Sequence, residues 1–234
     1  MDQEPIIGIG PADQLEYSPG EMMAAYRVKF EEAREAEDYH SLYRDFEFVV
    51  ETAKLLATRV RHNATAQGSD TSSVGEEDYV SRSLWIAALV TYGRCFHHGR
   101  RKHLNESDFE GQSEEVLQWH RYFKDTRDKH VAHSVNPFEE SATGVSIVDR
   151  ESDAPRVDGA GVVYLLRAGE PVEVVEQLRR HAAWLQQVVY QRYNEAIQKV
   201  IDKANSLSKE ELCQLPPLEM KPEMGFEAAR KARR

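Results

Sequence analysis

The stretch of sequence that decides the fold is residues 84–96, which read LWIAALVTYGRCF. Between about Asp78 and His98, apolar side chains occupy more than one face of a helix: Leu84, Trp85, Ala87, Ala88, Leu89, Val90, Tyr92 and Phe96. A helix that is apolar on several faces is usually surrounded by other elements. The sequence therefore predicts a core helix here.

Two helices are expected before the core helix. Ser18-Pro19-Gly20-Glu21 has the form of a capping box with proline at the first helical position, which predicts a helix from Pro19 to about Ala36. From Tyr39 to about Asn63, apolar residues recur at steps of three and four, which predicts a second helix. We expect these two helices to form a helical hairpin.

Two more helices are expected after the core helix. One spans about Ser113 to His133 and ends near Asn136, because Pro137 cannot continue it. The other begins near Pro171, runs to Ala204 and has the most regular apolar pattern of the chain. The fold class is therefore mostly α, with about five helices.

A short β-hairpin is expected before the last helix. Gly144 to Val148 and Val162 to Leu166 are rich in β-branched residues and are separated by turn residues. Two strands alone are only marginally stable in water, so this ribbon should pack on the helices or on a partner. The expected organisation is an irregular arm over 1–17, a helical domain over 18–205 with an insertion at about 143–167, and a flexible tail over 206–234.

Composition narrows the function classes. No window approaches the roughly 20 apolar residues of a membrane span, and the N-terminus lacks signal-peptide features, which favours a soluble, cytoplasmic protein. Cys95 and Cys213 have no CxxC partner, so we expect two small buried side chains rather than a disulfide or zinc site. The net charge of -10 argues against indiscriminate nucleic-acid binding. It leaves room for a local basic site at residues 92–103, where cations alternate with aromatic rings and imidazoles.

The main candidate for chemistry is Arg127-Asp128-Lys129-His130-Val131-Ala132-His133. At roughly 100° per residue, Arg127, His130 and His133 would share one side of a helix. Arginine offers a fork of donors suited to phosphate, and histidine moves protons near neutral pH. These groups suffice to cleave RNA without a metal, although a polar helix end of the same composition is also common.

This stretch resembles the signature of the HEPN superfamily, an arginine followed by four to six residues and a histidine. Here the spacing is five, with Asp128 in the polar position after the arginine. Together with the helix at 84–96, the resemblance covers roughly Tyr39 to Asn136, and the sequence is similar to bacterial abortive-infection and toxin-type HEPN proteins. The resemblance implies an up-and-down helical bundle that forms a homodimer, with two motifs meeting in one RNase cleft. It also implies that Arg127 contacts the scissile phosphate, His133 is the acid/base, and Asp128 orients one of them.

Other residues are expected to assist. His130 does not match the family spacing and is expected, with Lys129, to support RNA binding. Arg94 and Arg100 are expected to hold the RNA backbone at the margin of the cleft. Five histidines concentrate in one third of the chain (His97, His98, His103, His130 and His133), but their spacings match no standard zinc pattern, so no metal or other cofactor is expected.

Two hypotheses follow from these patterns. The first is a metal-independent endoribonuclease that acts in phage defence or as a toxin, with RNA as substrate and an antitoxin or other defence protein as a possible partner. The second is a non-catalytic HEPN module that binds a nucleotide, an RNA or a protein partner. The absence of a Gly-rich loop between a strand and a helix argues against ATP chemistry.

Overall fold

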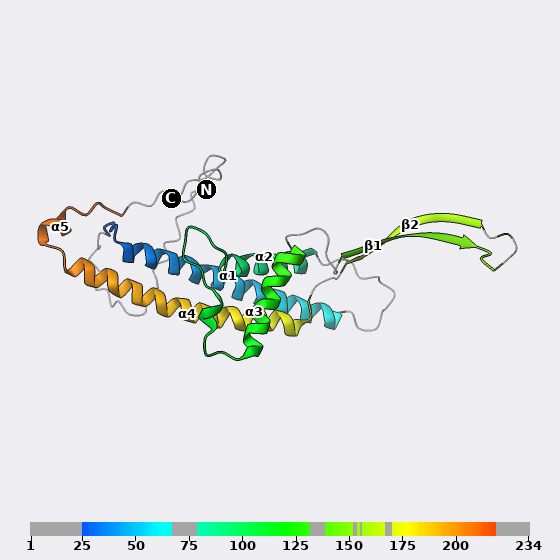
Figure 1. Ribbon diagram of the computed structural model, residues 1–234, viewed down its shortest axis with the longest axis horizontal. Coiled ribbons are helices and arrows are strands. Elements are labelled where there is room, and N and C mark those ends of the chain that lie inside the picture. Colours follow the sequence, from blue (N-terminus) through cyan, green and yellow to red (C-terminus); the bar gives the residue numbers. More distant parts are fainter. Residues whose placement is uncertain are drawn as a thin grey trace. The chain divides into compact units, whose positions relative to one another are not determined.

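The computed structural model describes residues 25–66, 79–131, 139–151, 154, 156–166 and 170–218. The chain divides into two compact units, one of residues Phe30–Asn205 and one of the two terminal segments, Met1–Lys29 and Ser206–Arg234. The described part is mostly helical, with five α-helices and a two-stranded antiparallel hairpin before the long helix α4, so the expected fold class is confirmed (Figure 1). None of the described helices is both long and apolar enough to cross a membrane.

Helix α1 (Glu31–Ala66) is one continuous helix, so the helical hairpin expected over 19–63 is wrong. The turn was expected at residues 37–38, but Glu37 and Asp38 are no stronger helix breakers than their neighbours, and neither is Gly or Pro. The predicted start at Pro19 lies outside the described residues. Helix α1 packs against a second long helix over most of its length, and that packing stabilises the helical conformation where the local sequence does not specify it.

Helix α4 (Val172–Asn205) runs antiparallel to α1, and the two lie side by side (Figure 1). Ion pairs mark both ends of the contact: Arg61 with Glu176 at 2.6 Å, and Lys199 with Glu35 at 3.9 Å. Between them α1 and α4 bury apolar stripes, which are Leu42, Phe46, Val49, Ala53, Leu56 and Ala57 on α1 and Val175, Leu178, Ala182, Leu185 and Val189 on α4.

Helix α2 (Tyr79–Arg94) packs against α1 and supplies Trp85, Ala88, Leu89 and Tyr92 to the core. It is a core helix as expected, but it is not enclosed on every side. Val80 and Val90 are 51% and 39% exposed. One face of α2 therefore presents apolar side chains to solvent.

Helix α3 (Glu114–Thr126) closes the core around two buried imidazoles. The Tyr92 hydroxyl lies 2.8 Å from Nδ1 of His120, while Nε2 of His181 on α4 has no hydrogen-bond partner among the described residues. Burial, with the charges of His181 and Lys124, lowers the pKa of His120 from 6.5 to about 4. Burial also lowers the pKa of His181 from 6.5 to about 4. Both side chains are therefore neutral in the folded core at neutral pH.

The hairpin consists of β1 (Glu139–Val148) and β2 (Arg156–Leu166), both longer than expected. Thr143 pairs with Val162, Val145 with Ala160, and Ile147 with Val157 after an irregularity at 146/147. Directly paired residues share a face, so these pairs form an apolar stripe. Its members Val145, Ile147, Val157 and Val162 are 44–68% exposed.

In the smaller unit, helix α5 (Lys209–Cys213) begins at Ser208, whose hydroxyl accepts from Glu211 N while the Glu211 carboxylate accepts from Ser208 N. Residues 25–27 and 216–218 form a short antiparallel contact, in which Arg27 N donates to Pro216 O and Leu218 N donates to Ala25 O, each at 2.8 Å. The described part of the expected tail over 206–234 thus contains regular structure.

Candidate functional site

The motif begins where α3 changes its backbone geometry. The helix starts at Ser113, whose side chain accepts from Val116 N, and after Thr126 the chain continues as a π-helix over Arg127–Val131. The expected continuation of a regular α-helix through residue 131 is therefore wrong, and the 100° step does not apply here. A π-helix has i→i+5 hydrogen bonds and is frequent at functional sites.

The structure describes part of the motif. The side chains of Arg127, Asp128 and Lys129 are described, and so is the backbone of His130. The His130 side chain and the whole of His133 lie outside the described residues. The predicted meeting of Arg127 with His133 therefore stays a prediction.

The Arg127 side chain lies across Gly93 in the last turn of α2. A Cβ added to Gly93 would meet Arg127 Cδ at 3.1 Å, Cγ at 3.2 Å and Nε at 3.3 Å. These separations are tighter than most contacts of a real Cβ, so a larger residue would force the arginine to shift. Glycine at position 93 thus allows Arg127 to lie close to α2, and only 24% of the Arg127 side chain is exposed.

Two side chains contact one end of the guanidinium. Arg127 Nη1 donates to Asp128 Oδ1 at 2.6 Å and lies 2.5 Å from His97 Nε2. An arginine can only donate, so in this contact Nε2 of His97 is the acceptor and the ring proton lies on Nδ1. Asp128 Oδ1 is also 3.7 Å from the same His97 nitrogen. Arg127, Asp128 and His97 together form what we call the Arg127 site.

The other edge of the guanidinium carries Nε and Nη2, and neither has a hydrogen-bond partner among the described residues. These two nitrogens donate in parallel, which matches two oxygens of a phosphate or carboxylate. Nη1 uses both of its protons on Asp128 and His97, which orients the guanidinium. The Arg127 site can therefore grip an oxyanion from one side while an imidazole and a carboxylate stand beside it.

Asp128 remains ionised next to the guanidinium. Partial burial acts to raise the pKa of Asp128, but the hydrogen bond from Arg127 and the charges of Arg127 and Lys124 lower it below its ordinary value. Lys129 points to Asp125, with Nζ 2.8 Å from Oδ2, and is well exposed. The structure describes two of the predicted catalytic residues, Arg127 and Asp128. Their side chains are hydrogen-bonded to each other.

Sequence reasoning did not assign His97 to the site, although it noted this residue within the basic stretch and the histidine-rich region. The residue lies three positions after the end of α2, and 49% of its side chain is exposed. The sequence does show a histidine just after the core helix. Its partner, Arg127, lies 30 residues away in sequence, so no local pattern links the two residues.

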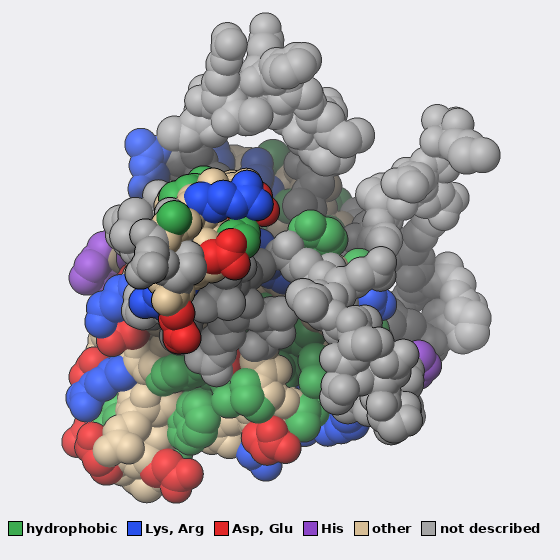
Figure 2. Space-filling model, turned by 90° about the vertical axis from the view of Figure 1, so that its right-hand side faces the viewer, with side chains coloured by type: hydrophobic (Ala, Val, Ile, Leu, Met, Phe, Trp, Pro, Cys, Tyr) green, Lys and Arg blue, Asp and Glu red, His purple; other side chains and the backbone are tan. Residues whose placement is uncertain are grey.

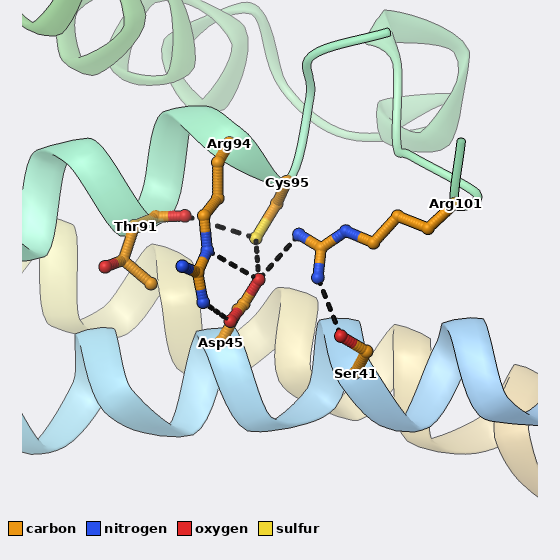
Figure 3. Close-up of polar contacts among 6 residues, drawn as sticks. All are labelled: Ser41, Asp45, Thr91, Arg94, Cys95 and Arg101. Carbon is orange, nitrogen blue, oxygen red and sulfur yellow. Dashed lines mark hydrogen bonds and ion pairs between the residues drawn. The ribbon is translucent and has the colours of Figure 1, made fainter. Parts of the chain in front are cut away.

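A second polar cluster lies at the same end of α2 and contains Arg94. Figure 3 shows Asp45 of α1 between Arg94 and Arg101. Arg94 Nε donates to Asp45 Oδ2 at 2.9 Å and its Nη2 contacts Oδ1, while Arg101 Nη2 donates to Oδ2 at 2.6 Å. Arg101 Nη1 also donates to Ser41 Oγ at 2.8 Å. RNA binding by Arg94 would have to compete with this ion pair.

The two cysteines differ. Cys95 is buried beside Asp45, where burial and the Asp45 charge raise its pKa to about 12, so the thiol is neutral and inert. It is the small buried side chain that was expected. Cys213 on α5 is exposed, so the same expectation is wrong for that residue.

The remaining cations and histidines are dispersed. Arg100 is exposed, and its carbonyl oxygen accepts from Arg34 Nη2 at 3.4 Å. The rings of His98 and His103 meet at 4.4 Å between centroids, away from the His97 contact. Among the residues that the structure describes, no group of three or more His, Cys, Asp or Glu side chains could hold a metal ion.

Comparison of the chain with protein-family models, curated proteins and solved structures gives no significant match.

Proposed function

We propose that this protein is a metal-independent endoribonuclease of the HEPN type, acting in phage defence or as a toxin. The observation that supports the proposal is the Arg127 site. A guanidinium is oriented over a glycine, its Nε and Nη2 have no partner among the described residues, and an imidazole and a carboxylate lie beside it. The motif resemblance assigns the phosphate to the same arginine.

In the proposed reaction, Arg127 binds the non-bridging oxygens of the scissile phosphate. The 2'-hydroxyl oxygen attacks phosphorus and loses its proton to a base, the bond from phosphorus to the 5'-oxygen breaks, and that oxygen takes up a proton. Charge builds on the phosphoryl oxygens during attack, and a fixed guanidinium stabilises it. His133 is the proposed acid/base, as the motif implies.

A homodimer is part of the proposal, with the face that carries Arg127 in the interface. Val90 is 39% exposed and lies about one turn before Gly93, the residue under Arg127. An exposed apolar side chain therefore lies near the Arg127 site, where the core of a dimer contact would be more apolar than its rim. Light scattering at micromolar concentration should give twice the mass of the chain, and a monomer would count against a composite cleft.

A second candidate is a non-catalytic module that binds a nucleotide, an RNA or a protein. The ion pairs of the basic stretch favour it, because Arg94 and Arg101 contact Asp45 and Lys102 contacts Glu35. On the face drawn in Figure 2, basic and acidic side chains are interspersed and do not form one basic surface. On this face the described side chains form no continuous basic track for an RNA backbone (Figure 2).

Cleavage of RNA in EDTA distinguishes the two candidates. We expect cleavage to persist in EDTA and to leave a 2',3'-cyclic phosphate. Arg127→Lys should lower the rate by about 10²- to 10³-fold, because a point charge cannot replace the bidentate grip. His133→Ala should lower it by about 10²- to 10⁴-fold with little change in thermal stability, and His130→Ala should keep most of the activity.

Arg121→Lys is the matched control for Arg127→Lys. Arg121 lies on α3, pairs with Glu106 and Glu114, and is half exposed, so its replacement should leave the rate unchanged. If cleavage requires zinc or manganese, the metal-independent mechanism is wrong. If His133→Ala melts the protein but keeps its specific activity, the motif is a structural helix end and the binding-module candidate replaces the nuclease.

A further inference from the structure

We infer that His97 is a catalytic residue of this site, the base that takes the proton from the attacking 2'-hydroxyl. The inference rests on the proposed function and adds a residue that the motif does not contain. His97 Nε2 lies 2.5 Å from Arg127 Nη1 and 3.7 Å from Asp128 Oδ1. A base must lie within hydrogen-bond reach of the proton that it takes, and His97 stands beside the group that binds the phosphate.

The backbone around His97 is held firmly at the end of α2. Cys95 and Phe96, the two preceding residues, are buried. Phe96 N donates to Gly93 O at 3.0 Å, and Leu104 N donates to Cys95 O at 2.9 Å. The His97 side chain is half exposed, so substrate can reach it while its attachment to the fold stays fixed.

The hydrogen bond from Arg127 also selects the tautomer. Because Nε2 of His97 accepts from a guanidinium, this nitrogen carries a lone pair and no proton in the protein without substrate. An incoming 2'-hydroxyl can replace the guanidinium N–H as donor to the same lone pair. His97 is thus already in the form that a general base needs.

The two neighbours then act on different states of the imidazole. When the phosphate binds, the Arg127 guanidinium interacts with the phosphate oxygens. Asp128 Oδ1 lies close enough to His97 Nε2 to stabilise the imidazolium that forms. In the complete step, the 2'-hydroxyl proton goes to His97 Nε2 as the 2'-oxygen bonds to phosphorus. The bond to the 5'-oxygen breaks, and that oxygen takes a proton from His133, the second imidazole proposed for the site.

His98 provides a matched control, since it is the next residue, is exposed, and has its ring against His103 at 4.4 Å and not against Arg127. We expect His97→Ala to lower kcat by about 10²- to 10⁴-fold with a small change in KM, whereas His98→Ala should leave both unchanged. The acidic limb of the pH–rate profile, where the base gains its proton, should be lost in His97→Ala and kept in His98→Ala. Thermal melting of both variants should match the wild type.

A spectroscopic measurement tests His97 without relying on activity. In protein with ¹⁵N-labelled histidine, long-range ¹H–¹⁵N correlation at pH 8 should show His97 protonated on Nδ1 alone. Arg127→Ala should shift it toward the Nε2–H form, while His98 should not change.

The possible failures can be told apart. If the wild type cleaves RNA and His97→Ala keeps its rate, or if His97 carries its proton on Nε2, the assignment of His97 is overturned and the proposed nuclease stands. If the wild type cleaves no RNA under any condition while the tautomer is as expected, the proposed function fails and the catalytic role of His97 fails with it.

Discussion

Two arginine-containing clusters lie at the C-terminal end of α2, and they differ in how fully their hydrogen bonds are made. In the Asp45 cluster, one buried carboxylate, 5% exposed, accepts from Arg94 and Arg101, and Arg101 also reaches Ser41 (Figure 3). In the Arg127 site, Asp128 and His97 occupy only Nη1, and the edge formed by Nε and Nη2 has no partner among the described residues. The first cluster is complete within the fold, and the second has donors left for a ligand.

This difference shows why an arginine in a basic stretch is weak evidence for a binding site. Arg94 and Arg127 both follow apolar helical segments, and sequence reasoning assigned both to RNA. The carboxylate opposite each one decides what it can do. Asp45 is buried on α1 and forms ion pairs with Arg94 and Arg101. Asp128 is next to Arg127 in sequence and bonds only to Nη1 of the guanidinium.

The largest effect is expected from Asp45→Ala. The substitution leaves Arg101, only 19% exposed, without its carboxylate, whereas Arg94, 57% exposed, can be hydrated, so we expect a loss of about 3 kcal/mol of unfolding free energy. Asp128→Ala is the control, because Asp128 is about one third exposed and its loss should cost less than about 1 kcal/mol. Urea denaturation measures both. Equal destabilisation by the two variants would show that the clusters do not differ as the structure indicates.

We expect acid to lower the free energy of unfolding, because two histidines are buried in the core. His120 and His181 have pKa values of about 4 in the folded protein against 6.5 ordinarily, so the unfolded chain binds protons first as the pH falls. Stability is therefore complete above pH 6.5 and decreases between pH 6.5 and about 4, by on the order of 3 kcal/mol for each histidine.

Urea midpoints at pH 7.5 and 4.5 measure this loss. His181→Leu removes one titrating ring whose Nε2 has no partner among the described residues, so it should reduce the pH dependence. Removal of the exposed imidazole in His98→Ala should not alter it. An unchanged pH dependence in His181→Leu would argue against a neutral buried imidazole at this position.

The smallest effect is expected from Gly93→Ala, which changes the Arg127 site and leaves the Asp45 cluster intact. The added Cβ would meet Arg127 at 3.1–3.3 Å and displace it. A displaced phosphate-binding group should lower RNA cleavage by about tenfold, since small misplacements at a reacting centre reduce rates strongly. Folding should change by less than about 1 kcal/mol, because alanine is favoured over glycine inside a helix and offsets the crowding.

Cleavage rate and thermal melting measured on the same sample separate these two effects. Gly99→Ala, in the exposed loop after α2, is the matched control because its nearest contact is at 4.0 Å. Wild-type activity in Gly93→Ala would mean that Arg127 need not lie on this helix to act.

Several elements could be predicted from the sequence because their signals are local. The apolar repeats of α2 and α4, the serine at the start of α3 and the β-branched runs of the hairpin each reflect a preference within a few residues. The same local reasoning failed where no local signal existed, at residues 37–38 of α1. There the chain stays helical because α1 packs along α4 over most of its length.

The sequence by itself determined the mostly helical fold with one β-hairpin and marked Arg127 and Asp128 as candidates, because helical periodicity and a short motif are both written in neighbouring residues. Only the tertiary structure decided the partners. It brought His97 and Gly93 to Arg127 across 30 and 34 residues, placed Arg94 on Asp45, and formed the π-helix at the end of α3. Such contacts depend on how helices distant in sequence pack, and no local pattern specifies which arginine keeps an unpaired edge.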